Sequence, residues 1–156
     1  MSHDVRQLVP GDAGTMRAML TMFGHAFEDV PTYCDRQPSD AYLKRLLGRN
    51  TFIALVAIGD DGNVSGGLAA YVLDKFEQAR SEIYIYDLAV AEPYRRQGIA
   101  TVLIEVLREV TRQRGAYVIF VQADPPDDAA AALDTKLGIR KDVLHFDIEA
   151  QPDAER

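Results

Sequence analysis

Two arginines and a glycine stand between a stretch typical of a β-strand and a stretch typical of a helix. They are Arg95, Arg96 and Gly98. The first backbone N–H groups of a helix have no partner within the helix, and the helix dipole favours negative charge beside them. Glycine allows a ligand to approach the backbone closely, and the arginines add positive charge. This pattern predicts an anion-binding turn suited to a phosphate group.

Two common phosphate-binding motifs do not fit this turn. A Walker A loop requires Gly-Lys-Ser/Thr, which is absent, and a dinucleotide fingerprint requires three glycines where only Gly98 is present. The alternative interpretation is a helix start with arginines on the surface. We favour the anion site because the strand, the turn and the helix agree with one another.

The turn is positioned by the elements on its two sides. Glu82–Val90 is rich in β-branched and aromatic residues, which predicts a strand, and Pro93 prevents its continuation. A helix is expected from Ile99 because apolar residues then recur with helical spacing. The residues of that apolar face are Ile99, Val102, Leu103, Val106, Leu107 and Val110.

The remaining elements predict a single α/β domain over residues 1–150, with a flexible tail at 151–156. The other expected strands are Asp4–Val9, Thr51–Ile58, Val64–Leu73, Ala116–Ala123 and Val143–Ile148. Asp12 is expected to cap a first helix that ends before Pro31, and further helices are expected over Ser39–Leu47 and from Asp127 or Asp128 to Leu137. The order β-α-α-β-β-β-α-β-α-β predicts a mixed sheet, mostly antiparallel, with about four helices.

Composition excludes several classes of function. The 156 residues have a net charge of −7, whereas nucleic-acid binding depends on a basic surface. No apolar run is long enough to span a membrane, and the N-terminus has no apolar signal region, so we expect a cytoplasmic protein. No histidine has metal-ligand spacing to a cysteine, a histidine or a carboxylate, so no metal is predicted. The single cysteine, Cys34, excludes an intrachain disulfide.

The pattern Arg95-x-x-Gly98-x-Ala100 resembles the pyrophosphate-binding turn of the GCN5-related N-acetyltransferases, which bind acetyl-CoA. The order of elements is also that of this superfamily. Several stretches are similar to one branch, the aminoglycoside 3-N-acetyltransferases of the gentamicin-resistance type. These stretches are Phe52–Leu55, Lys75–Gln78, Arg80–Val90, Arg95–Thr101, Gly115–Ile119, Val121–Asp124, Lys136–Arg140 and His145–Ile148.

The resemblance implies direct transfer of an acetyl group from acetyl-CoA to an amine, expected to be the 3-amino group, of a 2-deoxystreptamine aminoglycoside, which gives antibiotic resistance. In that fold two central strands splay apart, so that backbone groups of one strand bind the pantetheine arm and the turn amides bind the pyrophosphate. The cofactor-binding residues that it implies are Leu88, Ala89, Val90, Arg95, Arg96, Gln97, Gly98, Ile99, Ala100 and Thr101.

Asp87 is the candidate general base for such a transfer, because the attacking amine must be unprotonated. If the strand alternates regularly, Asp87 shares a face with Ile83, Ile85 and Ala89. Apolar neighbours raise the pKa of a carboxylate by desolvation, toward the range useful for accepting a proton. Two alternatives remain open: a bulge turns Asp87 to solvent, or Asp87 only binds the substrate.

A polycationic substrate requires an acidic pocket. The candidate substrate-binding residues are Asp87, Asp124, Glu28 and Asp147, with Asp29, Glu77 and Glu82 as further acidic residues near the expected site. The family often carries a tyrosine as general acid in the last helix, and Asp134 stands at that position here. An ionised carboxylate is a poor proton donor, so the general acid is left open.

Two other functions compete with the antibiotic-modifying enzyme. An acetyltransferase for polyamines or other small amines would use the same turn and the same acidic pocket. A non-catalytic CoA-binding module is consistent with Asp134 but not with the retention of Asp87 and the whole turn. The resemblance is also compatible with a homodimer, although no residue pattern identifies an interface.

Overall fold

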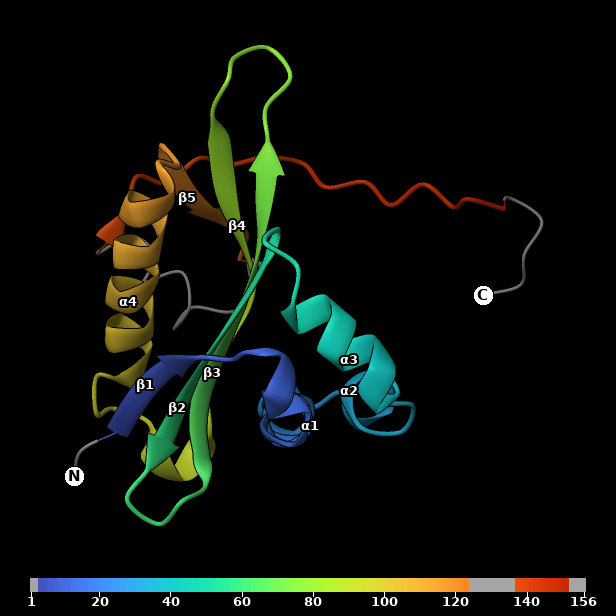
Figure 1. The fold of residues 1–156 in the computed structure, drawn as a ribbon, viewed down its shortest axis with the longest axis vertical. Helices are drawn as coiled ribbons and strands as arrows, with labels where there is room; N and C mark the ends of the chain where they lie inside the picture. The colour runs from blue at the N-terminus through green and yellow to red at the C-terminus, as the bar shows by residue number, and fades with distance from the viewer. Residues whose placement is uncertain (1–2, 124–136, 152–156) are drawn as a thin grey trace. The chain divides into compact units, whose positions relative to one another are not determined.

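The computed structural model describes residues 3–123 and 137–151. The chain divides into two units, Met1–Gln122 and Ala123–Arg156, and each is considered by itself. In the first unit, five strands form one sheet in the order β1-β2-β3-β4-β5, with β1 to β4 antiparallel and β4 and β5 parallel (Figure 1). The strands are β1 (His3–Gln7), β2 (Phe52–Gly59), β3 (Val64–Asp74), β4 (Ser81–Val90) and β5 (Val118–Val121).

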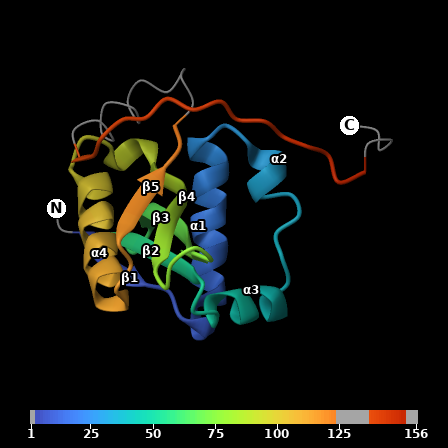
Figure 2. The ribbon, with the colours of Figure 1, turned by 90° about the horizontal axis from the view of Figure 1, so that it is seen from above.

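Helices lie on both faces of this sheet. They are α1 (Ala13–Ala26), α2 (Val30–Tyr33), α3 (Asp40–Leu47) and α4 (Ile99–Arg114), with 3-10 turns at Pro10–Asp12 and Glu92–Tyr94. Figure 2 shows α4 on one side of the sheet and α1 on the other, with α2 and α3 beyond α1. The predicted mixed, mostly antiparallel sheet with about four helices is confirmed.

The core consists of two apolar layers, one on each face of the sheet. The layer under α4 contains Ile53, Leu55, Leu68, Ile83, Ile85, Leu103 and Leu107. The layer under α1 contains Met16, Met19, Phe23, Leu43, Phe52, Val56 and Ala69. A Cβ atom at Gly67 of β3 would lie 2.5 Å from Met19 Sδ, so glycine allows α1 to pack unusually close to the sheet.

A bulge in β4 changes which residues face α1. Ala70 of β3 is opposite Ile85, but the next residue, Ala69, is opposite Asp87, so Tyr86 is the extra residue. A bulge reverses the alternation of all the residues that follow it. Ile85 therefore belongs to the layer under α4, whereas Asp87 faces the α1 side.

Other local differences from the predictions have simple causes. The short helix α2 was not expected, because Pro31 was taken as a helix break, yet proline is compatible with the first turn of a helix. Asp12 does not cap α1, because its carboxylate binds the Val9 N–H and Arg6 instead.

Residues 137–151 contain no strand, so the strand predicted at Val143–Ile148 is wrong. The helix predicted to end at Leu137 lies, apart from that residue, outside the described residues. Within the two described ranges, none of the helices combines the length and the apolarity that a bilayer crossing demands.

Candidate functional site

The turn before α4 adopts the conformation that an anion-binding helix start requires. Gly98 is in the left-handed region with φ 79°, and Arg96 also has a positive φ of 65°. The first backbone bond into α4 runs from Val102 N–H to the Gly98 carbonyl, so the preceding amides have no partner within the helix. A Cβ atom at Gly98 would meet nothing within 4 Å, so the space beside the turn is open.

Side chains from distant parts of the chain hold this turn. The ring of His3 in β1 lies 3.0 Å from Gln97 Oε1 through Nε2 and 2.9 Å from Ser65 Oγ through Nδ1. Arg95 donates from Nε to the Val90 carbonyl at 3.1 Å. The side chains of Arg95 and Gln97 thus stabilise the turn. Arg96, in contrast, is exposed and has no protein partner within the described residues.

The edge of β4 next to the turn is open over half of its length. β5 pairs with β4 only from Glu82 to Ile85, and beyond that point the described partner of β4 is β3 alone. Alternate residues of a strand direct their backbone groups to opposite edges, so groups of the segment Leu88–Val90 face away from β3. The predicted separation of the two central strands is thus seen between β4 and β5, which pair only up to Ile85.

Asp87 lies beside this open segment, on the face covered by α1 and α2. It is partly buried and accepts a hydrogen bond from the Tyr33 hydroxyl at 2.9 Å through Oδ2. Burial raises the pKa of the Asp87 carboxyl, while the bond from Tyr33 acts in the opposite direction. The prediction that Asp87 shares a face with Ile83 and Ile85 is wrong because of the bulge, and only the shared face with Ala89 is correct.

Tyr33 is the site residue that sequence reasoning missed. Its pKa is raised well above the ordinary range, first by burial and then by the charge of Asp87, so its proton remains on the phenol. Asp29 caps α2 by accepting from Thr32 N–H, which fixes the short helix that carries Tyr33. An aspartate followed by a proline within the first helical turn is a helix-start signal that could have revealed α2.

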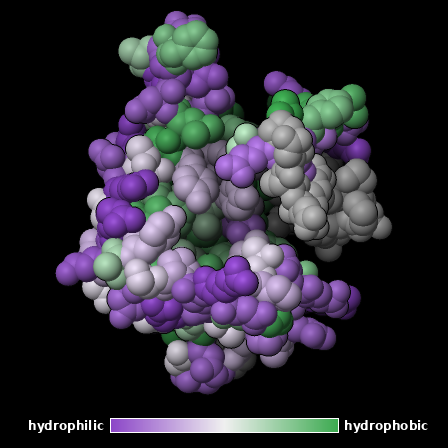
Figure 3. Space-filling view, turned by 90° about the vertical axis from the view of Figure 1, so that its right-hand side faces the viewer, coloured by the Kyte–Doolittle hydropathy of each residue, from purple (hydrophilic) through white to green (hydrophobic). Residues whose placement is uncertain are grey.

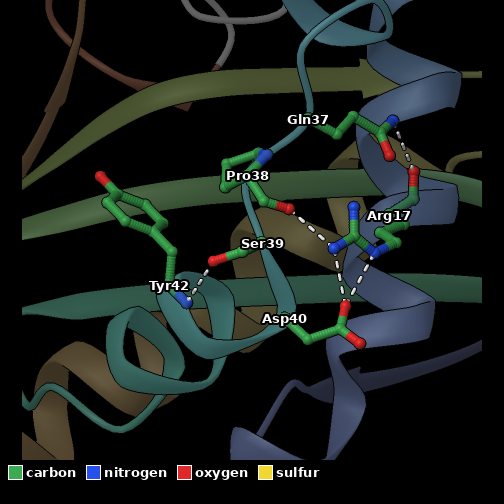
Figure 4. A network of polar contacts seen from close by, with 6 residues as sticks. All are labelled: Arg17, Gln37, Pro38, Ser39, Asp40 and Tyr42. Carbon is green, nitrogen blue, oxygen red and sulfur yellow. Dashed lines mark hydrogen bonds and ion pairs between the residues drawn. The ribbon is translucent and has the colours of Figure 1, made fainter.

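The connection that carries α2 is tied to α1 by polar contacts, shown in Figure 4. Arg17 of α1 binds the Asp40 carboxylate at 2.6 Å and the Pro38 carbonyl at 2.7 Å, and Ser39 caps α3 by accepting from Tyr42 N–H. These contacts hold the connection between α2 and α3 against α1.

The other acidic candidates are distributed over several places. Glu28, with φ 53°, lies at the α1–α2 connection near Tyr33. Glu82 binds Lys75 and Tyr117 at the other end of β4, about 17 Å of strand from Asp87. Glu77 also binds Lys75, so Glu77 and Glu82 are not part of the Asp87 site.

The two remaining candidates lie beyond the first unit. Asp147 contacts the His145 ring at 2.8 Å within residues 137–151. Asp124 lies outside the described residues, as does Asp134. Within the described residues, no group of three or more histidine, cysteine, aspartate or glutamate side chains could hold a metal ion.

Comparison with known proteins decides the family. Residues 17–139, most of the chain, match the Acetyltransferase (GNAT) family. The chain belongs to this family. GNAT enzymes use acetyl-CoA as the acetyl donor, and the resemblance seen in the turn Arg95–Thr101 is confirmed at this level.

Solved structures of aminoglycoside acetyltransferases resemble this chain over nearly its whole length. An aminoglycoside acetyltransferase, HMB0005 from an uncultured soil metagenomic sample, is 57% identical, with a TM-score of 0.94 over 97% of this chain and 100% of that one. A second, meta-AAC0020 from an uncultured soil metagenomic sample, has been solved with sisomicin and with trehalose. It is 29% identical, with a TM-score of 0.87 over 96% of this chain and 97% of that one.

The match to a further acetyltransferase is shorter. Acetyltransferase Atu2258 from Agrobacterium fabrum is 35% identical over 68 residues, which are 44% of this chain and 45% of that protein. The match therefore spans less than half the length of this relative.

Proposed function

We propose that this protein transfers an acetyl group from acetyl-CoA to an amine of a 2-deoxystreptamine aminoglycoside, with the 3-amino group of the gentamicin class as the expected position. The observation that carries the proposal is the partly buried Asp87 carboxylate beside the open edge of β4. Similarity to an aminoglycoside acetyltransferase at 57% identity supports the choice of substrate. Such an activity would give resistance to the antibiotic.

The turn before α4 fits the pyrophosphate of acetyl-CoA. The amides of residues 96–101 precede or begin the helix, and the open space beside Gly98 leaves room for the phosphate oxygens. The open backbone edge at Leu88–Val90 fits the amide groups of the pantetheine arm. The Ala91 N–H donates to the Ser65 carbonyl of β3, so by alternation the backbone groups of Ala89 also face β3. The Val90 carbonyl already accepts from Arg95, so we assign the contacts with the arm mainly to the backbone of Leu88 and to the Val90 N–H.

Asp87 would accept the proton that the amine loses as its nitrogen bonds to the acetyl carbon. The C–S bond of the thioester then breaks, and CoA leaves as the thiolate. Tyr33 occupies Oδ2, which leaves Oδ1 for the substrate. Because burial raises the pKa of Asp87, its carboxylate is a stronger base than an exposed aspartate. The same charge attracts the cationic substrate.

Further acidic residues would bind the other ammonium groups of an aminoglycoside. Glu28 lies on the same side of the sheet, at the end of α1, where its side chain starts from a strained backbone. We keep Asp124 and Asp147 as further substrate ligands in this proposal. The net charge of −7 suits a polycation and would accelerate its association at low salt.

The test is the release of free CoA thiol from acetyl-CoA with gentamicin, kanamycin and spermidine as parallel acceptors. We expect rapid release with gentamicin and little with spermidine, and NMR of the product to place the acetyl group on the 3-amino nitrogen. Release with spermidine alone would replace the substrate class with polyamines. No release with any acceptor, despite binding of acetyl-CoA, would favour a non-catalytic module.

A further inference from the structure

Five aromatic rings form a row across four strands on the α1 side of the sheet. Its members in order are Phe52 (β2), Tyr71 (β3), Tyr86 and Tyr84 (β4) and Phe120 (β5). Successive ring centroids are 5.3, 5.7, 5.9 and 4.7 Å apart. Three strand spacings of about 4.8 Å make the row roughly 14 Å wide, which is enough for more than one sugar ring.

The bulge places this row and the Asp87 carboxylate on the same face. Tyr84 lies between Ile83 and Ile85, which face α4, so Tyr84 faces α1. The extra residue Tyr86 contacts Tyr84 and Tyr71, and Asp87 follows it on the same face. A regular strand would have put either the aromatic ring or the carboxylate on the α4 side.

Core packing accounts for only one end of the row. Phe52 is 4% exposed, but Tyr71 is 37% exposed and Tyr86 is 61% exposed. Within the described residues the Tyr86 hydroxyl has no hydrogen-bond partner. Figure 3 looks onto this side, where pale and green side chains are visible below the β3–β4 hairpin at the top. Exposed adjacent aromatic rings beside a functional carboxylate indicate a binding surface.

The chemistry of the row suits amino sugars. An aromatic face packs against the C–H groups of a sugar ring, and it attracts an ammonium group placed over it. Phenol hydroxyls can donate to sugar hydroxyls or accept from them. The negative charge of Asp87 next to the row excludes acidic ligands and favours cationic ones.

We propose that Tyr71, Tyr86 and Tyr84 form the subsite for the sugar rings of the aminoglycoside beyond the reacting ring, with Tyr86 as the residue that determines preference for multi-ring acceptors. This inference rests on the proposed function and extends it. The ring that carries the reacting amine lies at Asp87, and the next ring lies on Tyr86.

The experiment compares two acceptors that differ in ring number, gentamicin and the single ring 2-deoxystreptamine. Steady-state acetyl transfer and calorimetric binding are measured for the wild type, Tyr86→Ala and Tyr86→Phe. We expect Tyr86→Ala to raise KM and Kd for gentamicin about tenfold, with the KM for acetyl-CoA and the values for 2-deoxystreptamine unchanged. Tyr86→Phe keeps the ring and should restore most of the gentamicin affinity.

Phe76→Ala is the matched control, because Phe76 is a fully exposed aromatic residue outside the row, in the β3–β4 connection. It should leave all constants unchanged. Equal losses for both acceptors in Tyr86→Ala, or no loss, would overturn the subsite while leaving the proposed function intact. Absence of gentamicin binding and acetylation in the wild type would overturn the proposed function and the subsite together.

Discussion

The turn before α4 and the Asp87 site lie at the two ends of the same short segment, and they offer opposite kinds of chemistry. The turn offers backbone amides. The side chains of Arg95 and Gln97 form hydrogen bonds within the protein that stabilise the shape of the turn. The Asp87 site offers a carboxylate whose properties come from side chains of other elements, above all Tyr33. The groups that would bind the common donor are backbone amides of one short segment, with His3 as a distant support, whereas the part that would select the acceptor is assembled from side chains of several elements.

This difference predicts which substitutions each site tolerates. A backbone site tolerates most side-chain changes but not the loss of the conformation that only glycine adopts easily. A carboxylate site tolerates backbone variation nearby but not the loss of one functional group. Substitutions in the two places should therefore separate donor binding from turnover.

The largest effect is expected for Asp87→Asn. An amide cannot accept the proton, so kcat/KM for gentamicin should fall about 10²–10⁴-fold, while the Kd for acetyl-CoA stays within twofold. Steady-state kinetics and calorimetry measure the two quantities. Asp74→Asn at the exposed end of β3 is the control and should change neither. Undiminished turnover would remove Asp87 from the mechanism and end the contrast between the two sites.

Gly98→Val should affect the other site, with an effect of about 10–100-fold on the Kd for acetyl-CoA. Valine is strained at φ 79° and would fill the open space that we assign to the pyrophosphate. Gly62→Val is a matched control, since Gly62 has nearly the same φ of 80° and equally open surroundings, but lies in the β2–β3 turn. If both variants lose the same affinity for acetyl-CoA, the effect comes from backbone strain alone and not from blocking the pyrophosphate.

Tyr33→Phe should change the pH dependence of kcat/KM, because Tyr33 influences the pKa of Asp87. The hydrogen bond from Tyr33 lowers the pKa of Asp87, so its removal raises that pKa further. A base must be deprotonated to act, and the acid limb of kcat/KM should therefore move to higher pH, with the loss of activity confined to the acid side of the profile. If the acid limb of kcat/KM stays at the same pH in Tyr33→Phe, the group whose protonation limits the reaction is not Asp87.

The smallest effect is expected in stability. The folded pKa of Asp87 lies above the unfolded value near 3.8, so the folded state binds more protons between the two values and loses stability as pH rises through that window. Asp87→Asn removes this cost and should raise Tm at pH 7 by about 2 °C, with no gain at pH 3. A lower Tm at pH 7 would assign Asp87 a structural role instead.

The sequence predicted what depends on local patterns. Glycine at the turn and the apolar period after Ile99 each act within a few residues, and α3 and α4 lie where helices were expected. The face of Asp87 could not be predicted, because it depends on one extra residue in the register between β3 and β4. Tyr33 was missed because its partner is 54 residues away and Pro31 obscured its helix.

The bulge at Tyr86 has a consequence for how related genes can diverge. Substitution at this position changes one exposed side chain, whereas deletion of a single codon between Ile85 and Asp87 would restore regular alternation. The carboxylate would then still face α1, opposite Ala69, and the residues after it would keep their faces, so the deletion would remove one aromatic ring and leave the place of Asp87 unchanged. Lineages that retain the Asp87 function should therefore tolerate variation in length at this point, whereas those that acetylate multi-ring acceptors should keep an aromatic residue there.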